Sequence, residues 1–190
     1  MKRIFIGIPA SEEIQSKVLA WKEQNLSLNP SPSFGEGNLR WVKPKNLHIT
    51  LVPPWQSEGI EAISHKLKAI SFTPFEIKFE SISFGPNKND PKLIWASGTA
   101  TKEILDLRLK IYEALGQKAD ERPFRLHMTL ARLPFDFAPS TPLGSFAQDI
   151  LRFLPENVKW RMVVDRFVLY ESLLKPEGAE YEVLEEFRLE

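Results

Sequence analysis

The sequence lacks cysteine entirely and has only three histidines among its 190 residues. Without thiols the chain forms no disulfide, no thiolate metal site and no thiol nucleophile, which is typical of a reducing compartment. An excess of either charge is also absent, since 25 basic residues balance 25 acidic ones. The overall field therefore does not attract a polyanion, and any contact with nucleic acid must be local. Chemistry must come from His, carboxylates, hydroxyls, Lys or Arg.

The sequence also lacks any apolar run long enough to cross a membrane, which takes about 20 residues. Its first residues, MKRIFIGIPASEE, contain one short apolar stretch and no signal-peptide pattern. These absences favour a cytoplasmic protein without a membrane partner, and we expect a monomer. The length fits one domain of moderate size and no composition shift marks a boundary, so we expect a single bilobal domain over residues 1–190.

Apolar periodicity predicts short strands and helices in a repeated order. The predicted strands cover residues 3–9, 46–52, 75–84, 92–98, 125–131, 159–172 and 180–190. The predicted helices cover residues 11–25, 58–70, 101–116 and 144–154. Ser11 and Thr101 are suited to cap helix N-termini, and Gly116 is suited to end a helix. The strand-helix-strand order occurs twice, which predicts an α+β fold of two related lobes with mainly antiparallel sheet.

Two of the three histidines lie in copies of one motif. Residues 46–52 read NLHITLV and residues 125–131 read RLHMTLA. Alternate side chains of a strand share a face, so His48 and Thr50 project together, about 6–7 Å apart, while their apolar neighbours enter a core. His127 and Thr129 are related in the same way. Two lobes that face each other would bring both pairs to one cleft.

Paired imidazoles and hydroxyls suit phosphoryl chemistry without a metal. A neutral imidazole accepts a proton from water while a protonated one donates to the leaving oxygen, and each transfer contributes about 10²–10⁴-fold. Threonine hydroxyls are suited to donate to phosphate oxygens where charge develops. A single histidine on a half-buried strand is usually structural, but two matched copies favour function. His65 falls on the solvated face of a predicted helix, which argues against a three-histidine metal site.

The motifs and their surroundings resemble the RNA 2′,3′-cyclic phosphodiesterase (2′-5′ RNA ligase) family of the two-histidine (2H) phosphoesterase superfamily. The resemblance rests on five segments in the family's order: RIFIGI, RWVKPKNLHITL, FGPNKNDPKLIWASG, RPFRLHMTLAR and LYESLLKPEGAEYEVL. It implies two pseudo-symmetric lobes with mainly antiparallel sheets flanking a central cleft, and helices outside. It also implies that His48 and His127 are catalytic, that Thr50 and Thr129 bind the phosphate, and that no cofactor is needed.

Three further residues are candidates for substrate binding. The resemblance assigns Arg132 to the phosphate, although strand alternation places it on the opposite face from His127, so the assignment requires a bend at the strand end. Arg125 shares the parity of His127 and needs no such bend. The family usually continues after the first motif with an apolar residue and glycine, whereas this chain has VPPWQ. We expect the two prolines to place Trp55 in a loop, where it is a candidate for stacking on a base.

The resemblance implies hydrolysis of 2′,3′-cyclic phosphate ends of RNA or nucleotides, with the 3′ oxygen leaving and a 2′-phosphate as product. RNA 3′ ends or nucleotides with a 2′,3′-cyclic phosphate are the expected partners. Two alternatives in the same class remain open at this point, namely 2′-5′ RNA ligation and hydrolysis of a small cyclic-phosphate metabolite. An alternative from another class is a non-catalytic module that binds phosphorylated RNA ends.

Overall fold

The computed structural model describes residues 1–26, 40–87, 90–119, 122–133, 154, 156–175 and 178–190. Its helical elements are α1 (Glu12–Leu26), the 3₁₀ helix η1 (Pro44–Asn46), α2 (Ile60–Lys68) and α3 (Lys102–Leu115). Its strands are β1 (Lys2–Pro9), β2 (Arg40–Trp41), β3 (His48–Ser57), β4 (Phe75–Pro86), β5 (Pro91–Gly98), β6 (Leu126–Arg132), β7 (Glu156–Val164), β8 (Arg166–Lys175) and β9 (Gly178–Arg188).

The strands form two antiparallel sheets. The first has the order β3-β1-β8-β9 and the second the order β2-β6-β5-β4-β7. The strands β3 and β6, which carry the two histidine motifs, contact each other where the sheets meet. One contiguous cluster of buried apolar side chains includes members of both sheets, such as Ile49 of β3 and Met128 of β6. The α+β architecture of two mainly antiparallel sheets predicted from the sequence is confirmed.

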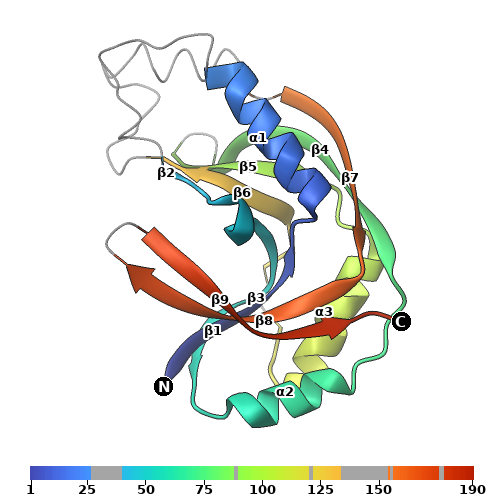
Figure 1. The fold of residues 1–190 in the computed structure, drawn as a ribbon. Coiled ribbons are helices and arrows are strands. Elements are labelled where there is room, and N and C mark those ends of the chain that lie inside the picture. Colours follow the sequence, from blue (N-terminus) through green and yellow to red (C-terminus); the bar gives the residue numbers. More distant parts are fainter. Residues whose placement is uncertain (27–39, 88–89, 120–121, 134–153, 155, 176–177) are drawn as a thin grey trace.

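The helices cover the outer faces of the sheets, and two of them pack on the sheet opposite to the one they follow in the chain. Helix α1 follows β1 of the first sheet but packs on β7 of the second (Figure 1). Helix α3 follows β5 of the second sheet but packs on β3 of the first, beside α2. Each sheet is therefore partly covered by a helix that follows a strand of the other sheet. This arrangement connects the two sheets.

Local signals in the sequence fix the ends of the helices. The main-chain N–H of Ile14 donates to the Ser11 hydroxyl, and that of Ile104 donates to the Thr101 hydroxyl, so both predicted N-caps are confirmed. Gly116 ends α3 in the left-handed conformation with φ of 68°, which glycine adopts without steric cost. Most of the helix predicted over residues 144–154 lies outside the described residues.

The structure corrects the prediction that Trp55 lies in a loop. Strand β3 continues through Pro53 and Pro54, and Trp55 pairs with Ile4 of β1. The prolines are tolerated because the register of β1 and β3 shifts between Ile4 and Ile6, which is the kind of irregularity that accommodates proline in a sheet.

Among the described residues, no helix is long and apolar enough to span a membrane.

Gly98, the last residue of β5, lies against the main chain of β4. A Cβ atom at this position would overlap the carbonyl oxygen of Lys78, which is main chain and has no rotamer with which to yield. We expect Gly98→Ala to lower the free energy of unfolding by about 1–3 kcal/mol, as overpacking does in well-packed sites. Denaturant unfolding measures this change.

Gly59 provides the control for that substitution, because a Cβ atom there meets nothing within 4 Å. Gly59→Ala should cost less than Gly98→Ala, since it changes only the N-cap of α2. Equal losses of stability in the two variants would contradict the close approach of β5 and β4.

Candidate active site

The two histidine motifs occupy equivalent places at the junction of the sheets. His48 and Thr50 of β3 are half-buried and alternate with Ile49 and Leu51, which are about 1% exposed. In β6, the half-buried pair His127 and Thr129 alternates with fully buried Met128 and Leu130. The apolar side chains fix each strand against its core, so the polar pair of each strand is held on the opposite face.

A β-bulge follows the threonine of each motif. In the first sheet, Gly7 pairs with Thr50 but Ile6 pairs with Val52, so one residue is extra on β3. In the second sheet, Trp95 pairs with Thr129 but Ile94 pairs with Ala131, so one residue is extra on β6. A bulge reverses the alternation of the residues beyond it.

The bulge in β6 explains how Arg132 reaches the site. Leu130 and Ala131 are both buried, so Arg132 returns to the face of His127 and Thr129. Simple alternation placed it on the other face because the sequence does not show the extra residue. This is the bend that the sequence assignment of Arg132 required.

Each histidine is held by a hydrogen bond to the main chain two residues before it. His48 Nδ1 lies 2.7 Å from the carbonyl oxygen of Asn46, and His127 Nδ1 lies 2.9 Å from that of Arg125. A carbonyl oxygen only accepts, so Nδ1 carries the proton in both rings. In the neutral ring, Nε2 is therefore a free base, and in the protonated ring it is a donor. Both rings are thus arranged to transfer protons through Nε2.

Aromatic side chains support both imidazoles. The His48 ring centroid lies 4.9 Å from that of Phe5 and 5.0 Å from that of Tyr181. The His127 ring lies 4.6 Å from Trp95, whose indole N–H donates to the hydroxyl of Ser83. These contacts limit rotation of the rings and exclude water from one side of each.

The same surroundings lower the pKa of both histidines below the ordinary value of 6.5. Burial is the largest cause for each ring, and the hydrogen bond to the carbonyl opposes it. The positive charges of His127 and Arg132 lower the pKa of His48 further, and Arg125 lowers that of His127. Positive charge from β6 therefore opposes protonation of the histidine on β3.

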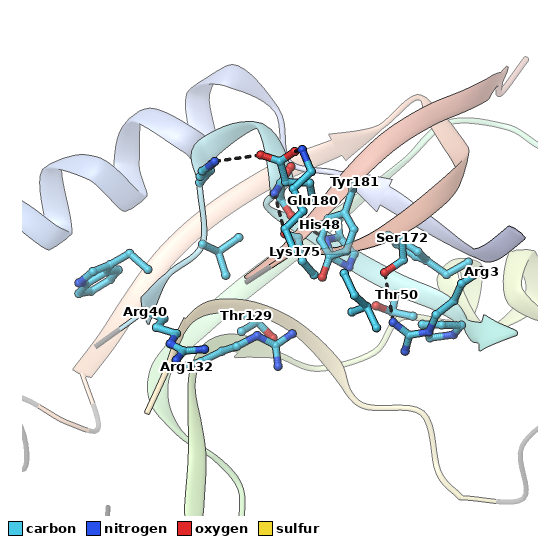
Figure 2. A pocket seen from close by; sticks show the side chains of 18 residues that line it. Arg3, Arg40, His48, Thr50, Thr129, Arg132, Ser172, Lys175, Glu180 and Tyr181 are labelled. Carbon is cyan, nitrogen blue, oxygen red and sulfur yellow. Dashed lines mark hydrogen bonds and ion pairs between the residues drawn. The ribbon is translucent and has the colours of Figure 1, made fainter. Parts of the chain in front are cut away.

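A cavity of about 780 Å³ opens where the motifs meet. Thr50 and His48 line it from the first sheet, and Thr129 and Arg132 line it from the second (Figure 2). The lining includes five basic side chains and one acidic side chain, which are Arg3, Arg40, Lys43, Arg132, Lys175 and Glu180. In a protein of zero formal net charge, this is a local concentration of positive charge suited to an anion.

The basic side chains divide into two groups. Lys175 and Lys43 lie 2.5 Å and 3.2 Å from Glu180, and their hydrogen bonds hold its pKa at about 2. In contrast, Arg3, Arg40 and Arg132 make no ion pair with a carboxylate within the part of the chain that the structure describes. Arg40 and Arg132 are even direct register partners on β2 and β6, where like charges destabilise a sheet. These guanidinium groups remain available to a bound anion.

The other sequence candidates lie outside this lining. His127 precedes Thr129 on the same face of β6, with its ring against Trp95. Arg125 is exposed and donates to the carbonyl oxygen of Pro86 at 3.4 Å, while its own carbonyl accepts from His127. Trp55 packs against the hydrophobic core, and Pro54 lines the cavity in its place.

His65 is exposed on α2, so the structure keeps it apart from the two motifs. Within the described residues, no three His, Asp or Glu side chains form a group that could hold a metal ion.

Sequence reasoning missed Arg3, Arg40, Phe5 and Tyr181. Arg3 and Phe5 alternate with buried Ile4 on β1, and this alternation was a usable signal once one face of the strand was known to line a cavity. Arg40 and Tyr181 carried no such signal, because only the pairing of β2 with β6 and of β9 with β8 brings them to the site.

Comparison with known proteins agrees with this geometry. The family model of the 2′-5′ RNA ligase superfamily matches residues 11–175, which include both motifs. The chain belongs to the 2′-5′ RNA ligase superfamily. Among relatives, the RNA 2′,3′-cyclic phosphodiesterase of Archaeoglobus fulgidus is 28% identical over 189 residues, covering 97% of this chain and 99% of the relative. That of Thermus thermophilus is 28% identical and covers 98% of this chain and 90% of the relative.

Solved structures share the fold of this chain. TT0787 of Thermus thermophilus superimposes with a TM-score of 0.73 at 25% identity, covering 98% of this chain and 97% of the other. LigT of E. coli in its apo form superimposes with a TM-score of 0.71 at 21% identity, covering 99% of this chain and 97% of the other. The predicted membership is therefore confirmed by the family model and the relatives, and the predicted fold by the solved structures.

The hydrogen bonds of the histidines predict their protonation in solution. Nitrogen NMR should show both His48 and His127 as the tautomer with the proton on Nδ1 at neutral pH, because each Nδ1 faces a carbonyl oxygen. Their titration midpoints should both lie below 6.5, since burial disfavours the charged form. Each ring therefore becomes charged only as the pH falls below that value. A proton on Nε2 of either neutral ring, or a midpoint above 6.5, would contradict the geometry described for that site.

Proposed function

We propose that this chain hydrolyses 2′,3′-cyclic phosphate ends of RNA or nucleotides to 2′-phosphates by general acid-base catalysis. The proposal rests on one observation above all: two histidines on different sheets each direct Nδ1 to a main-chain carbonyl, and their motifs supply His48, Thr50, Thr129 and Arg132 to one cavity whose arginines lack carboxylate partners among the described residues. The names of seven relatives, all RNA 2′,3′-cyclic phosphodiesterases, support it at identities of 25–29%.

In the proposed reaction, one neutral imidazole takes a proton from water through Nε2. The water oxygen bonds to phosphorus, and the bond from phosphorus to the 3′ oxygen breaks. The other imidazole is protonated and gives its Nε2 proton to the 3′ oxygen, so that a 2′-phosphate and a 3′-hydroxyl result. In-line displacement requires the two groups on opposite sides of phosphorus, and strands β3 and β6, which belong to different sheets and contact each other, suit that requirement.

Without substrate, the lowered pKa of each histidine suits the role of general base, because the imidazole is mainly neutral at any pH above its pKa. The acid must hold a proton, and the anionic substrate favours this by raising the pKa of the imidazole beside it. Thr50 and Thr129 are proposed to donate to the non-bridging oxygens, where charge develops. Arg132 is proposed to pair with the same phosphate, since its guanidinium has the geometry for two parallel hydrogen bonds. The roles of Arg125 and Trp55 in substrate binding stay predictions.

The same site is suited to 2′-5′ ligation if a 5′-hydroxyl replaces water as the attacking group, and the superfamily name favours testing it. An assay that supplies an RNA with a 5′-hydroxyl beside the cyclic-phosphate substrate separates the two outcomes. A monomeric state, a cytoplasmic location and independence of metal ions remain predictions from the sequence.

We expect His48→Ala and His127→Ala each to lower turnover of a nucleoside 2′,3′-cyclic phosphate by at least about 10²-fold, because each removes one proton-transfer group. The assay contains a strong chelator, so that the expected wild-type activity is independent of metal. His65→Ala is the matched control, since this histidine is exposed on α2, and it should retain full turnover. Near wild-type turnover in either motif variant, with its fold intact by circular dichroism, would disprove the two-histidine mechanism.

A further inference from the structure

The proposed chemistry leaves part of the cavity unused. The reacting phosphate needs the two histidines, the two threonines and Arg132, all close to the junction of β3 and β6. The cavity continues along β1 past Phe5 to Arg3, where Ser172 of β8 also lines it. Figure 2 shows Arg3 and Ser172 on the Thr50 side of the cavity, whereas Arg40, Thr129 and Arg132 lie on the other side.

Strand register gives the separation of Arg3 from the reacting groups. On β1, Gly7 pairs with Thr50, whereas Arg3 pairs with Gln56. The Arg3 backbone therefore lies four residues beyond Gly7, or about 13 Å along the strand. Phe5 occupies the position between them on the same face, with its ring against His48. Arg3 is thus one side-chain position further along the cavity than the ring that supports the proposed catalytic histidine.

Arg3 is held in place and its charge is not neutralised. Its guanidinium donates to the hydroxyl of Ser172 at 3.2 Å, and Ser172 is only 6% exposed. This bond uses one of five donors, and among the described residues Arg3 has no carboxylate partner. The neighbouring acid, Glu171, is paired with Lys2 instead. A half-buried guanidinium with free donors and fixed geometry is suited to bind a phosphate.

We infer that Arg3, positioned by Ser172, forms a second phosphate subsite that binds the 5′ phosphate group of the nucleotide carrying the cyclic phosphate. The inference rests on the proposed function. In an RNA strand, this second group is the phosphodiester that joins the terminal nucleotide to its neighbour. A free nucleoside 2′,3′-cyclic phosphate lacks it. The subsite therefore makes RNA ends, rather than free cyclic nucleotides, the preferred substrate class.

The test compares uridine 2′,3′-cyclic phosphate with the same compound carrying a 5′-phosphate, since the two differ only in that group. For the wild type, we expect kcat/KM to be at least about tenfold higher for the compound with the 5′-phosphate. This ratio corresponds to the lower end of the range for hydrogen bonds to a charged group. Arg3→Gln removes the charge and keeps a donor for Ser172. It should abolish the preference, so that its kcat/KM values for the two compounds agree within about twofold.

Two control variants locate the effect. Arg161→Gln makes the same charge change on the exposed surface of β7 and should retain the full preference. Arg40→Gln removes one positive charge on the other side of the cavity and should also retain the preference. The inference is overturned if the wild type shows no preference, if Arg3→Gln keeps it, or if Arg40→Gln removes it instead. An equal loss on both substrates in Arg3→Gln also overturns it, because Arg3 would then serve the reacting phosphate.

A binding measurement separates this inference from the proposed function. If the wild type hydrolyses neither compound, the proposed activity fails, but the subsite is still testable by calorimetry. Uridine 3′,5′-bisphosphate should then bind about tenfold more tightly than uridine 3′-phosphate to the wild type and equally tightly to Arg3→Gln. Equal affinities for the two ligands in the wild type would rule out the subsite.

Discussion

The hydrogen bond from each Nδ1–H to a main-chain carbonyl two residues earlier is the constraint on which the proposed chemistry depends. It fixes the tautomer, and it leaves Nε2 of both His48 and His127 as the reactive atom. The bond is local to each motif, because the accepting carbonyl belongs to Asn46 or Arg125, just before the strand that carries the histidine. The apolar residues that alternate with the histidines anchor β3 and β6 in the core. Packing and chemistry are therefore encoded in the same short motif.

The repeated motif has a second consequence, because its bulge is repeated as well. Beyond Thr50 and Thr129, both strands gain one residue and reverse their alternation. In β6 the reversal brings Arg132 into the cavity, and in β3 the corresponding stretch contains Pro53 and Pro54. The two lobes are thus similar in backbone and different in charge. Strand β6 carries an arginine directly after its motif, whereas β3 carries prolines at the corresponding place.

Sequence reasoning reached the motifs, the helix caps and the antiparallel sheets because these depend on local periodicity. Alternation alone paired His48 with Thr50 and His127 with Thr129, and Ser11 and Thr101 were visible as caps. It failed where one extra residue changes the outcome: the bulge that turns Arg132 inward and the irregular pairing that keeps Trp55 in a strand. Arg40 and Tyr181 were beyond its reach, because strand pairing between distant segments brings them to the cavity.

Burial and charge act on the site in the same direction until an anion binds. Burial lowers the pKa of both histidines, and the positive charge of Arg132 lowers that of His48 further. In a site without a bound anion, protonation of either imidazole is therefore disfavoured. A bound phosphate anion opposes both effects, since it pairs with the arginines and favours protonation of one imidazole. The protonated acid and the neutral base thus coexist most readily when substrate is present, which couples catalysis to binding.

The product of ring opening tests the central claim most directly. If His48 and His127 act on opposite sides of phosphorus with one bound orientation of the ribose, a single P–O bond breaks. Phosphorus NMR of the product from a nucleoside 2′,3′-cyclic phosphate should show only the 2′-phosphate, formed in the presence of a strong chelator. A 3′-phosphate, or a mixture of the two isomers, would contradict the assigned geometry even if both histidines proved essential.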